Sequence, residues 1–168
     1  MKTVILLTVL ASVVLCSPQG QNRESVKFGA LCSGNPTNRK RGCDAAKYGC
    51  GNYGASRSGG KRKHVGLDII CADGATVYAP FDVTLNGKAV PYSITDKKDK
   101  RIPINDGINL RGEGLCFKLF YVKPDSYRGT VKKGQKIGKL LPIQRVYPGM
   151  TSHVHVQMCD KSDPTKYF

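Results

Sequence analysis

The chain has 168 residues and a formal net charge of +15, with 27 lysines and arginines against 12 acidic residues. This length allows one compact domain with a real core. The 19 glycines and nine prolines favour short strands joined by turns, and they disfavour a helical bundle. After the first twenty residues no apolar stretch reaches membrane length, so we expect no membrane anchor.

Residues 1–17 are predicted to be a secretory signal peptide. Lys2 supplies a positive start, and residues 4–14 form an apolar run too short to span a bilayer. Small residues follow at Cys16 and Ser17, near which cleavage is expected. We therefore expect a secreted, extracellular protein.

Removal of this segment leaves six of the seven cysteines. An even number in an oxidising compartment predicts three disulfides, but the spacing leaves their pairing open. Only Cys43 and Cys50, seven positions apart, look like the closure of a local loop.

The rest of the chain divides by composition. Residues 18–63 are predicted to be an N-terminal lead-in, loose up to residue 31, and a loop-rich cap pinned by its cysteines. Residues 64–160 carry the strand patterns and are predicted to be one β domain. Residues 161–168 are predicted to be an irregular C-terminal tail.

Alternating apolar residues predict strands within residues 64–72, 74–90, 108–122, 127–143 and 152–159. The Asn86-Gly87 pair predicts a hairpin turn. Residues 93–107 form a charged insert, which we expect to be exposed. No segment has sustained helical spacing, so the fold class is predicted to be mainly antiparallel β.

The basic charge suits a polyanionic partner, such as sulfated polysaccharide, a bacterial surface or an acidic receptor. Secretion argues against nucleic acid. The alternative is solvated charge that only keeps the protein soluble. The candidate polyanion-binding residues are Lys61, Arg62, Lys63, Lys97, Lys98, Lys100 and Arg101.

All three histidines fall in two short motifs. His153 and His155, two residues apart on a predicted strand, point to the same face. His64 precedes Asp68 by four residues, about 13 Å if extended, so the chain must bend, and Gly66 tolerates a bend. Nitrogen and oxygen donors of this kind suit Zn²⁺. Each motif is weak evidence alone, and their combination is stronger.

The segments "HVGLD" and "HVH", with "GATVYAPFDVTLNG" and "VKKGQKIGKLL" between them, resemble the M23 (lysostaphin-like) metallopeptidase family over about residues 62–158. A wider match, including "GCGNYGASR", "FKLFYVKP" and the cysteine pattern, resembles the chemotaxin family of small secreted vertebrate proteins. The resemblance implies an antiparallel, barrel-like β core with a disulfide-pinned cap.

The M23 resemblance implies that His64, Asp68 and His155 hold one Zn²⁺ per chain, and that His153 matches a catalytic histidine. A second catalytic histidine of those enzymes is matched here by Tyr121. Because tyrosine is a poor base at neutral pH, we expect no peptidase activity, with both residues left as vestiges of a catalytic pair.

The chemotaxin resemblance implies a secreted, cytokine-like protein that attracts leukocytes, neutrophils among them, in innate immunity through cell-surface receptors. Two alternatives stay open: an active zinc endopeptidase on bacterial wall peptides, and a polyanion binder without a dedicated receptor. The same resemblance implies the disulfides Cys32–Cys71, Cys43–Cys50 and Cys116–Cys159.

Overall fold

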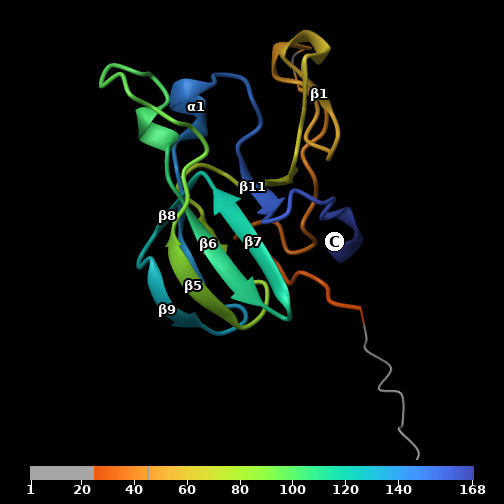
Figure 1. The fold of residues 1–168 in the computed structure, drawn as a ribbon, viewed down its shortest axis with the longest axis vertical. Helices are drawn as coiled ribbons and strands as arrows, with labels where there is room; N and C mark the ends of the chain where they lie inside the picture. The colour runs from red at the N-terminus through yellow and green to blue at the C-terminus, as the bar shows by residue number, and fades with distance from the viewer. Residues whose placement is uncertain (1–24, 45) are drawn as a thin grey trace, which may run out of the picture.

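A computed structural model describes residues 25–44 and 46–168, so the predicted signal peptide lies outside the described residues. The prediction of a mainly antiparallel β fold is confirmed, with eleven strands in this part of the chain. In Figure 1 the strands form the body of the molecule, and the segment that carries β1 rises beside it. No helix of the described residues is long and apolar enough to cross a membrane.

The largest sheet has six antiparallel strands. In spatial order they are β3 (Leu67–Ile70), β11 (His153–Met158), β7 (Leu115–Phe120), β6 (Gly107–Gly112), β5 (Val83–Lys88) and β9 (Arg128–Val131). All six residues of β11 are buried, because this strand lies between two others and is covered on both faces.

A smaller antiparallel sheet and a short hairpin complete the strands. The small sheet has the order β4 (Thr76–Tyr78), β10 (Lys136–Leu140) and β8 (Val122–Pro124), and the hairpin pairs β1 (Ser56–Arg57) with β2 (Arg62–Lys63). The helical segments are α1 (Ile143–Val146), η1 (Ala46–Tyr48), η2 (Ser58–Gly60), η3 (Ile102–Ile104) and η4 (Thr165–Tyr167). Side chains of both larger sheets meet in one hydrophobic core.

The end of the lead-in packs into this core, so the prediction that it is loose is wrong for residues 25–31. Phe28 and Leu31 are buried, and the ring of Phe28 contacts those of Phe117 and Phe168. Isolated apolar residues in a glycine-rich stretch have no period that would reveal such burial.

The predicted hairpin at Asn86-Gly87 is also wrong, since both residues lie within β5. Gly87 has φ +94°, and the register with β6 shifts between Leu85 and Lys88, which marks a β-bulge. A glycine with positive φ serves a bulge as well as a tight turn, so the dipeptide alone does not distinguish them.

Three disulfides cross-link the described residues, in the pairs that the family resemblance implies. Cys32–Cys71 ties the cap to the end of β3, and Cys116–Cys159 ties β7 to the residue after β11. Cys43–Cys50 closes a loop within the cap. The cap is thereby held against the strand that carries Asp68.

We expect Phe117→Ala to lower the free energy of unfolding by about 3–5 kcal/mol, because it empties a fully buried aromatic site. The Phe117 ring lies 5.0 Å from that of Phe28 and 5.7 Å from that of Phe81, centroid to centroid. Guanidinium chloride unfolding with intact disulfides measures the change, and Phe117→Leu, which keeps most of the apolar volume, should cost less. A loss below about 1 kcal/mol for the alanine variant would contradict this packing.

Candidate metal centre

Strand pairing brings two of the three predicted ligands together. β11 runs antiparallel to β3, and His155 lies directly opposite Asp68 in this ladder. His64 precedes β3 and is fixed by backbone hydrogen bonds, its N–H donating to Ala55 and its carbonyl accepting from Gly54. The hairpin of the cap therefore sets the position of the third ligand.

The three side chains converge on one point. His64 Nε2 lies 3.0 Å from His155 Nδ1 and 3.2 Å from Asp68 Oδ1, and the latter two atoms are 2.9 Å apart. Tetrahedral zinc with bonds of about 2.0–2.2 Å sets its ligand atoms about 3.3–3.6 Å apart, so small side-chain movements suffice. Two imidazoles and a carboxylate are a donor set that Zn²⁺ accepts, and this cluster can hold a metal ion.

The outward nitrogens of both histidines have acceptors. His64 Nδ1 lies 2.8 Å from the carbonyl oxygen of Asn52, and His155 Nε2 lies 3.4 Å from Oε1 of Gln157. If each outward nitrogen carries the proton and donates it, the inward nitrogens are left as lone-pair donors. Such partners orient the histidines of metal sites.

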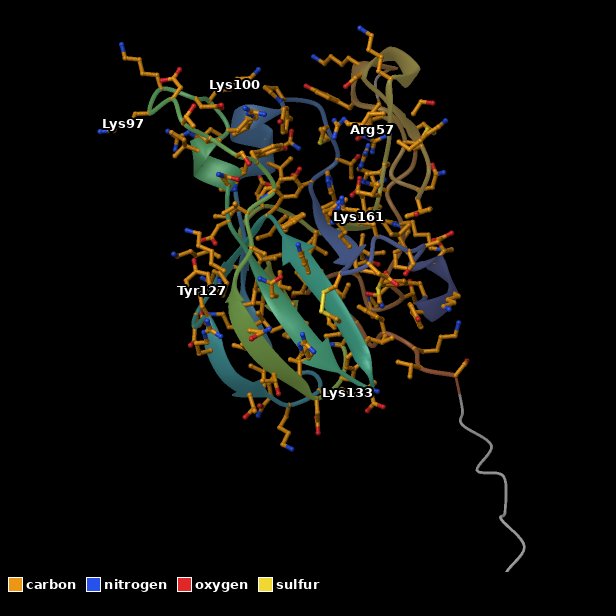
Figure 2. The ribbon with its side chains drawn as sticks, in the orientation of Figure 1. Arg57, Lys97, Lys100, Tyr127, Lys133 and Lys161 are labelled. Carbon is orange, nitrogen blue, oxygen red and sulfur yellow. A yellow bond between two sulfur atoms is a disulfide. The ribbon has the colours of Figure 1, made fainter. Side chains whose placement is uncertain are left out.

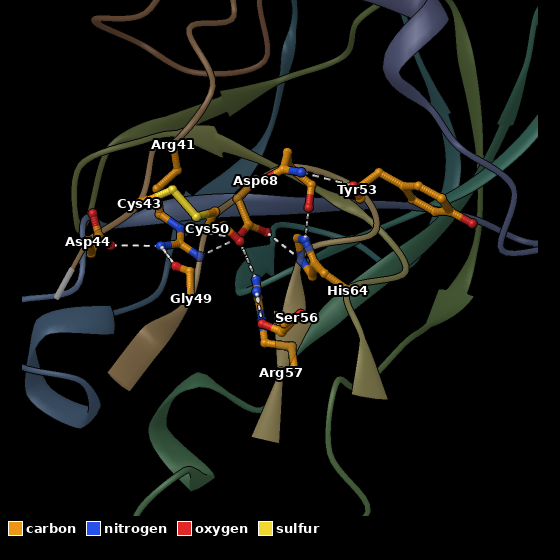
Figure 3. The surroundings of a disulfide bond; sticks show 11 residues. Arg41, Cys43, Asp44, Gly49, Cys50, Tyr53, Ser56, Arg57, His64 and Asp68 are labelled. Atoms are coloured by element: carbon orange, nitrogen blue, oxygen red, sulfur yellow. Dashed lines mark hydrogen bonds and ion pairs between the residues drawn. A yellow bond between two sulfur atoms is a disulfide. The ribbon is translucent and has the colours of Figure 1, made fainter. Parts of the chain in front are cut away.

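The second oxygen of Asp68 is bound by a residue that the sequence analysis missed. Arg41, 3% exposed, donates from Nε and Nη2 to Asp68 Oδ2 over 3.2 and 3.0 Å. Its Nη1 donates to Asp44 and to the carbonyl of Gly49, inside the disulfide-closed loop (Figure 3). The only signal was a run of basic residues, which is more typical of solvated charge.

Asp68 is held as an anion despite its burial. Desolvation alone would raise the pKa of its carboxyl. The charge of His153 and hydrogen bonds with the two other histidines outweigh desolvation and keep this pKa well below its usual range. The carboxylate is therefore ready to bind a cation.

Gly66 is required for a reason other than the predicted bend. Its φ lies outside the left-handed region, so any residue could adopt this backbone. A Cβ at this position would lie 2.4 Å from the His155 ring. Glycine is needed here because the ring packs against its Cα.

His153 and Tyr121 lie beside this triad. Nδ1 of His153 donates to the carbonyl of Thr151 at 2.7 Å, and its Nε2 lies 3.6 Å from Asp68 Oδ2. Burial lowers the pKa of His153, although Asp68 opposes this effect. The rings of His153 and Tyr121 meet edge to face, with centroids 5.5 Å apart.

Tyr121 belongs to a cluster of three tyrosines that the sequence analysis also missed. The hydroxyl of Tyr92 lies 2.8 Å from that of Tyr121 and 3.1 Å from that of Tyr147. Burial raises the pKa of all three, so they stay neutral. The three come from segments far apart in the chain, and no local pattern links them.

A cavity of about 440 Å³ joins the three candidate metal ligands, His153 and the three tyrosines. Of the predicted polyanion-binding residues, Arg62, Lys63 and Arg101 line it. Among those that do not are Lys97 and Lys98, which are exposed on the insert (Figure 2 labels Lys97). The predicted polyanion-binding residues therefore do not form one continuous surface.

We expect Gly66→Ala to weaken metal binding by about tenfold or more, since the added methyl must push the His155 ring away from Asp68. Competition with a chromophoric chelator measures the affinity for Zn²⁺. Gly42→Ala is the matched control, because a Cβ there meets nothing within 4 Å. Equal affinities of the two variants would refute the steric role of Gly66.

Comparison with known proteins places the chain in a family. No family model matches it. Leukocyte cell-derived chemotaxin-2 of Mus musculus is 44% identical over 165 residues, which cover 98% of this chain and 97% of that protein. The protein of the same name from Bos taurus is 44% identical over 163 residues, with 97% and 95% covered. Myeloid protein 1 of Gallus gallus is 50% identical over 144 residues, or 85% of this chain, which spans only 42% of that longer protein. The chain belongs to the leukocyte cell-derived chemotaxin-2 family.

Proposed function

We propose that the protein is a secreted signalling protein that attracts leukocytes, including neutrophils, in innate immunity through cell-surface receptors, and that it binds one structural Zn²⁺ and does not cleave peptides. The names of its relatives from Mus musculus and Bos taurus support the chemotactic role. The observation that carries the loss of catalysis is the neutral, hydrogen-bonded Tyr121 where M23 enzymes have a histidine.

Secretion is supported by the three disulfides, which persist in oxidising compartments. The predicted signal peptide at residues 1–17 agrees with this location, although it lies outside the described residues. Sulfated polysaccharide and bacterial surfaces are further candidate partners because of the basic charge.

The chemistry of Tyr121 opposes peptidase activity. Hydrolysis at a zinc centre needs a group that takes a proton from the attacking water and a donor that stabilises the oxyanion. His153 could serve as one of these groups, but Tyr121 cannot replace an imidazole as a base because burial raises its pKa further above neutrality. Losing one positioned acid–base group typically costs about 10²–10⁴-fold in rate.

The triad residues would hold Zn²⁺ where the cap meets the sheet. When bound, the ion would supply positive charge between two buried imidazoles and the Asp68 carboxylate. His64 belongs to the segment fixed by the β1–β2 hairpin, whereas Asp68 and His155 are in paired strands. A metal bound by all three would therefore fasten the cap to the sheet, which is a structural role.

We expect the purified protein to contain about one zinc per chain, measured by elemental analysis, and a chelator to lower its thermal stability. His155→Ala should lose the metal because it removes one of three ligands. His153→Ala is the control and should keep the metal, since His153 lies outside the triad. A native protein free of metal, or equal zinc loss in both variants, would disprove the zinc assignment.

We expect zinc-loaded protein to attract neutrophils in a migration assay and to leave peptidoglycan and a pentaglycine peptide uncleaved. Tyr121→His tests whether the missing imidazole is the reason for the lack of cleavage, because it places an imidazole at this position. Zinc-dependent cleavage by the natural sequence would instead establish the endopeptidase alternative. Absence of migration together with absence of cleavage would reject the signalling role.

A further inference from the structure

The cavity beside the triad is strongly cationic. Six lysines and arginines line it against a single carboxylate, that of Asp68. Asp68 is already engaged by Arg41 and the histidines. Lys47, Arg62 and Lys63 have no acidic side chain within 4.0 Å among residues 25–44 and 46–168. The lining thus has positive charge that no neighbouring acidic side chain of the described residues neutralises.

The inner wall also has an unused hydrogen-bond donor. The three tyrosine hydroxyls carry three protons but make only two contacts with one another. At least one proton therefore has no acceptor within this cluster, and no other acceptor for these hydroxyls occurs in the part of the chain that the structure describes. A neutral hydroxyl lining a cavity can donate to an anionic oxygen.

Two parts of the chain hold these groups on separate walls. Arg62 and Lys63 form β2 of the cap, next to Arg57, whose Nη2 reaches to 3.9 Å from Asp68 Oδ2 (Figure 3). Tyr92 lies on the opposite segment, where Asn105 fixes its backbone by two hydrogen bonds. The guanidinium of Arg101 stacks 4.7 Å from the centre of the Tyr92 ring. Tyr92 and Arg101 are therefore held in place before any ligand binds.

We propose that this cavity binds a sulfated sugar unit of an anionic polysaccharide, with sulfate oxygens accepting from the cations of β2 and from the tyrosine hydroxyls. The volume of about 440 Å³ is in the range of small-ligand sites. A donor-rich lining suits a ligand rich in acceptors, and an acidic peptide would bring a backbone N–H for every residue, which the engaged Asp68 cannot accept. This site does not depend on the signalling role.

The test measures the affinity of the full, disulfide-bonded protein for a heparin-derived tetrasaccharide, by calorimetry at about 0.15 M salt. The combined variant Tyr92→Phe, Tyr121→Phe and Tyr147→Phe removes every hydroxyl of the cluster and should weaken binding about tenfold. Arg62→Gln combined with Lys63→Gln should weaken it about fivefold, because two exposed cations are lost. Both of these residues are exposed, so this variant stays informative even if the triple phenylalanine variant fails to fold.

The matched control is Lys97→Gln combined with Lys98→Gln, which removes the same charge from the insert, outside the cavity. It should change the affinity by less than about twofold. Equal losses for the two double variants would show binding by diffuse charge and overturn the site. Equally tight binding of a hexaglutamate peptide, or no effect of a folded triple phenylalanine variant, would overturn it as well.

Discussion

The buried carboxylate of Asp68 is the constraint on which the rest of the site depends. A charge with 1% exposure is costly unless its oxygens are paired and hydrogen-bonded. Here Oδ1 faces two histidines while Oδ2 accepts from Arg41. Removing Arg41 would leave this buried charge without its closest cation, so the strand, the cap and the candidate metal ligands depend on one another.

Arg41 extends this constraint to the cap. Through Asp44, which also accepts from the backbone and hydroxyl of Thr151, the same guanidinium links the Cys43–Cys50 loop to the approach of β11. The cap is thus more than a cover held by disulfides, because its ion pairs reach Asp68 in the candidate metal centre. The cap supplies one wall of the cavity, so the ion pairs of Arg41 also hold that wall in place.

The cluster of His64, Asp68 and His155 was predictable only in part from local signals. Strand alternation places His153 and His155 on the same face, and the M23 resemblance, not the spacing, singles out His155. Pairing of β11 with β3 sets His155 opposite Asp68. Arg41 was not predictable, since its burial depends on a carboxylate 27 positions away. The contact of Tyr92 with Tyr147, 55 positions apart, is likewise a product of the tertiary fold. Sequence patterns reveal chemistry carried by one element and miss partners that only packing brings together.

A tyrosine at position 121, where the M23 resemblance implies a histidine, has two physical consequences that point the same way. Burial raises the pKa of Tyr121 and keeps it protonated, although the hydroxyl contact with Tyr92 opposes this effect, so it cannot act as a base near neutral pH. The same protonated state makes the tyrosine cluster a hydrogen-bond donor toward the cavity. A site of this kind stabilises anionic oxygens without taking up protons, and the cations of the cap add to the same preference. A tyrosine at this position is therefore better suited to binding than to proton transfer.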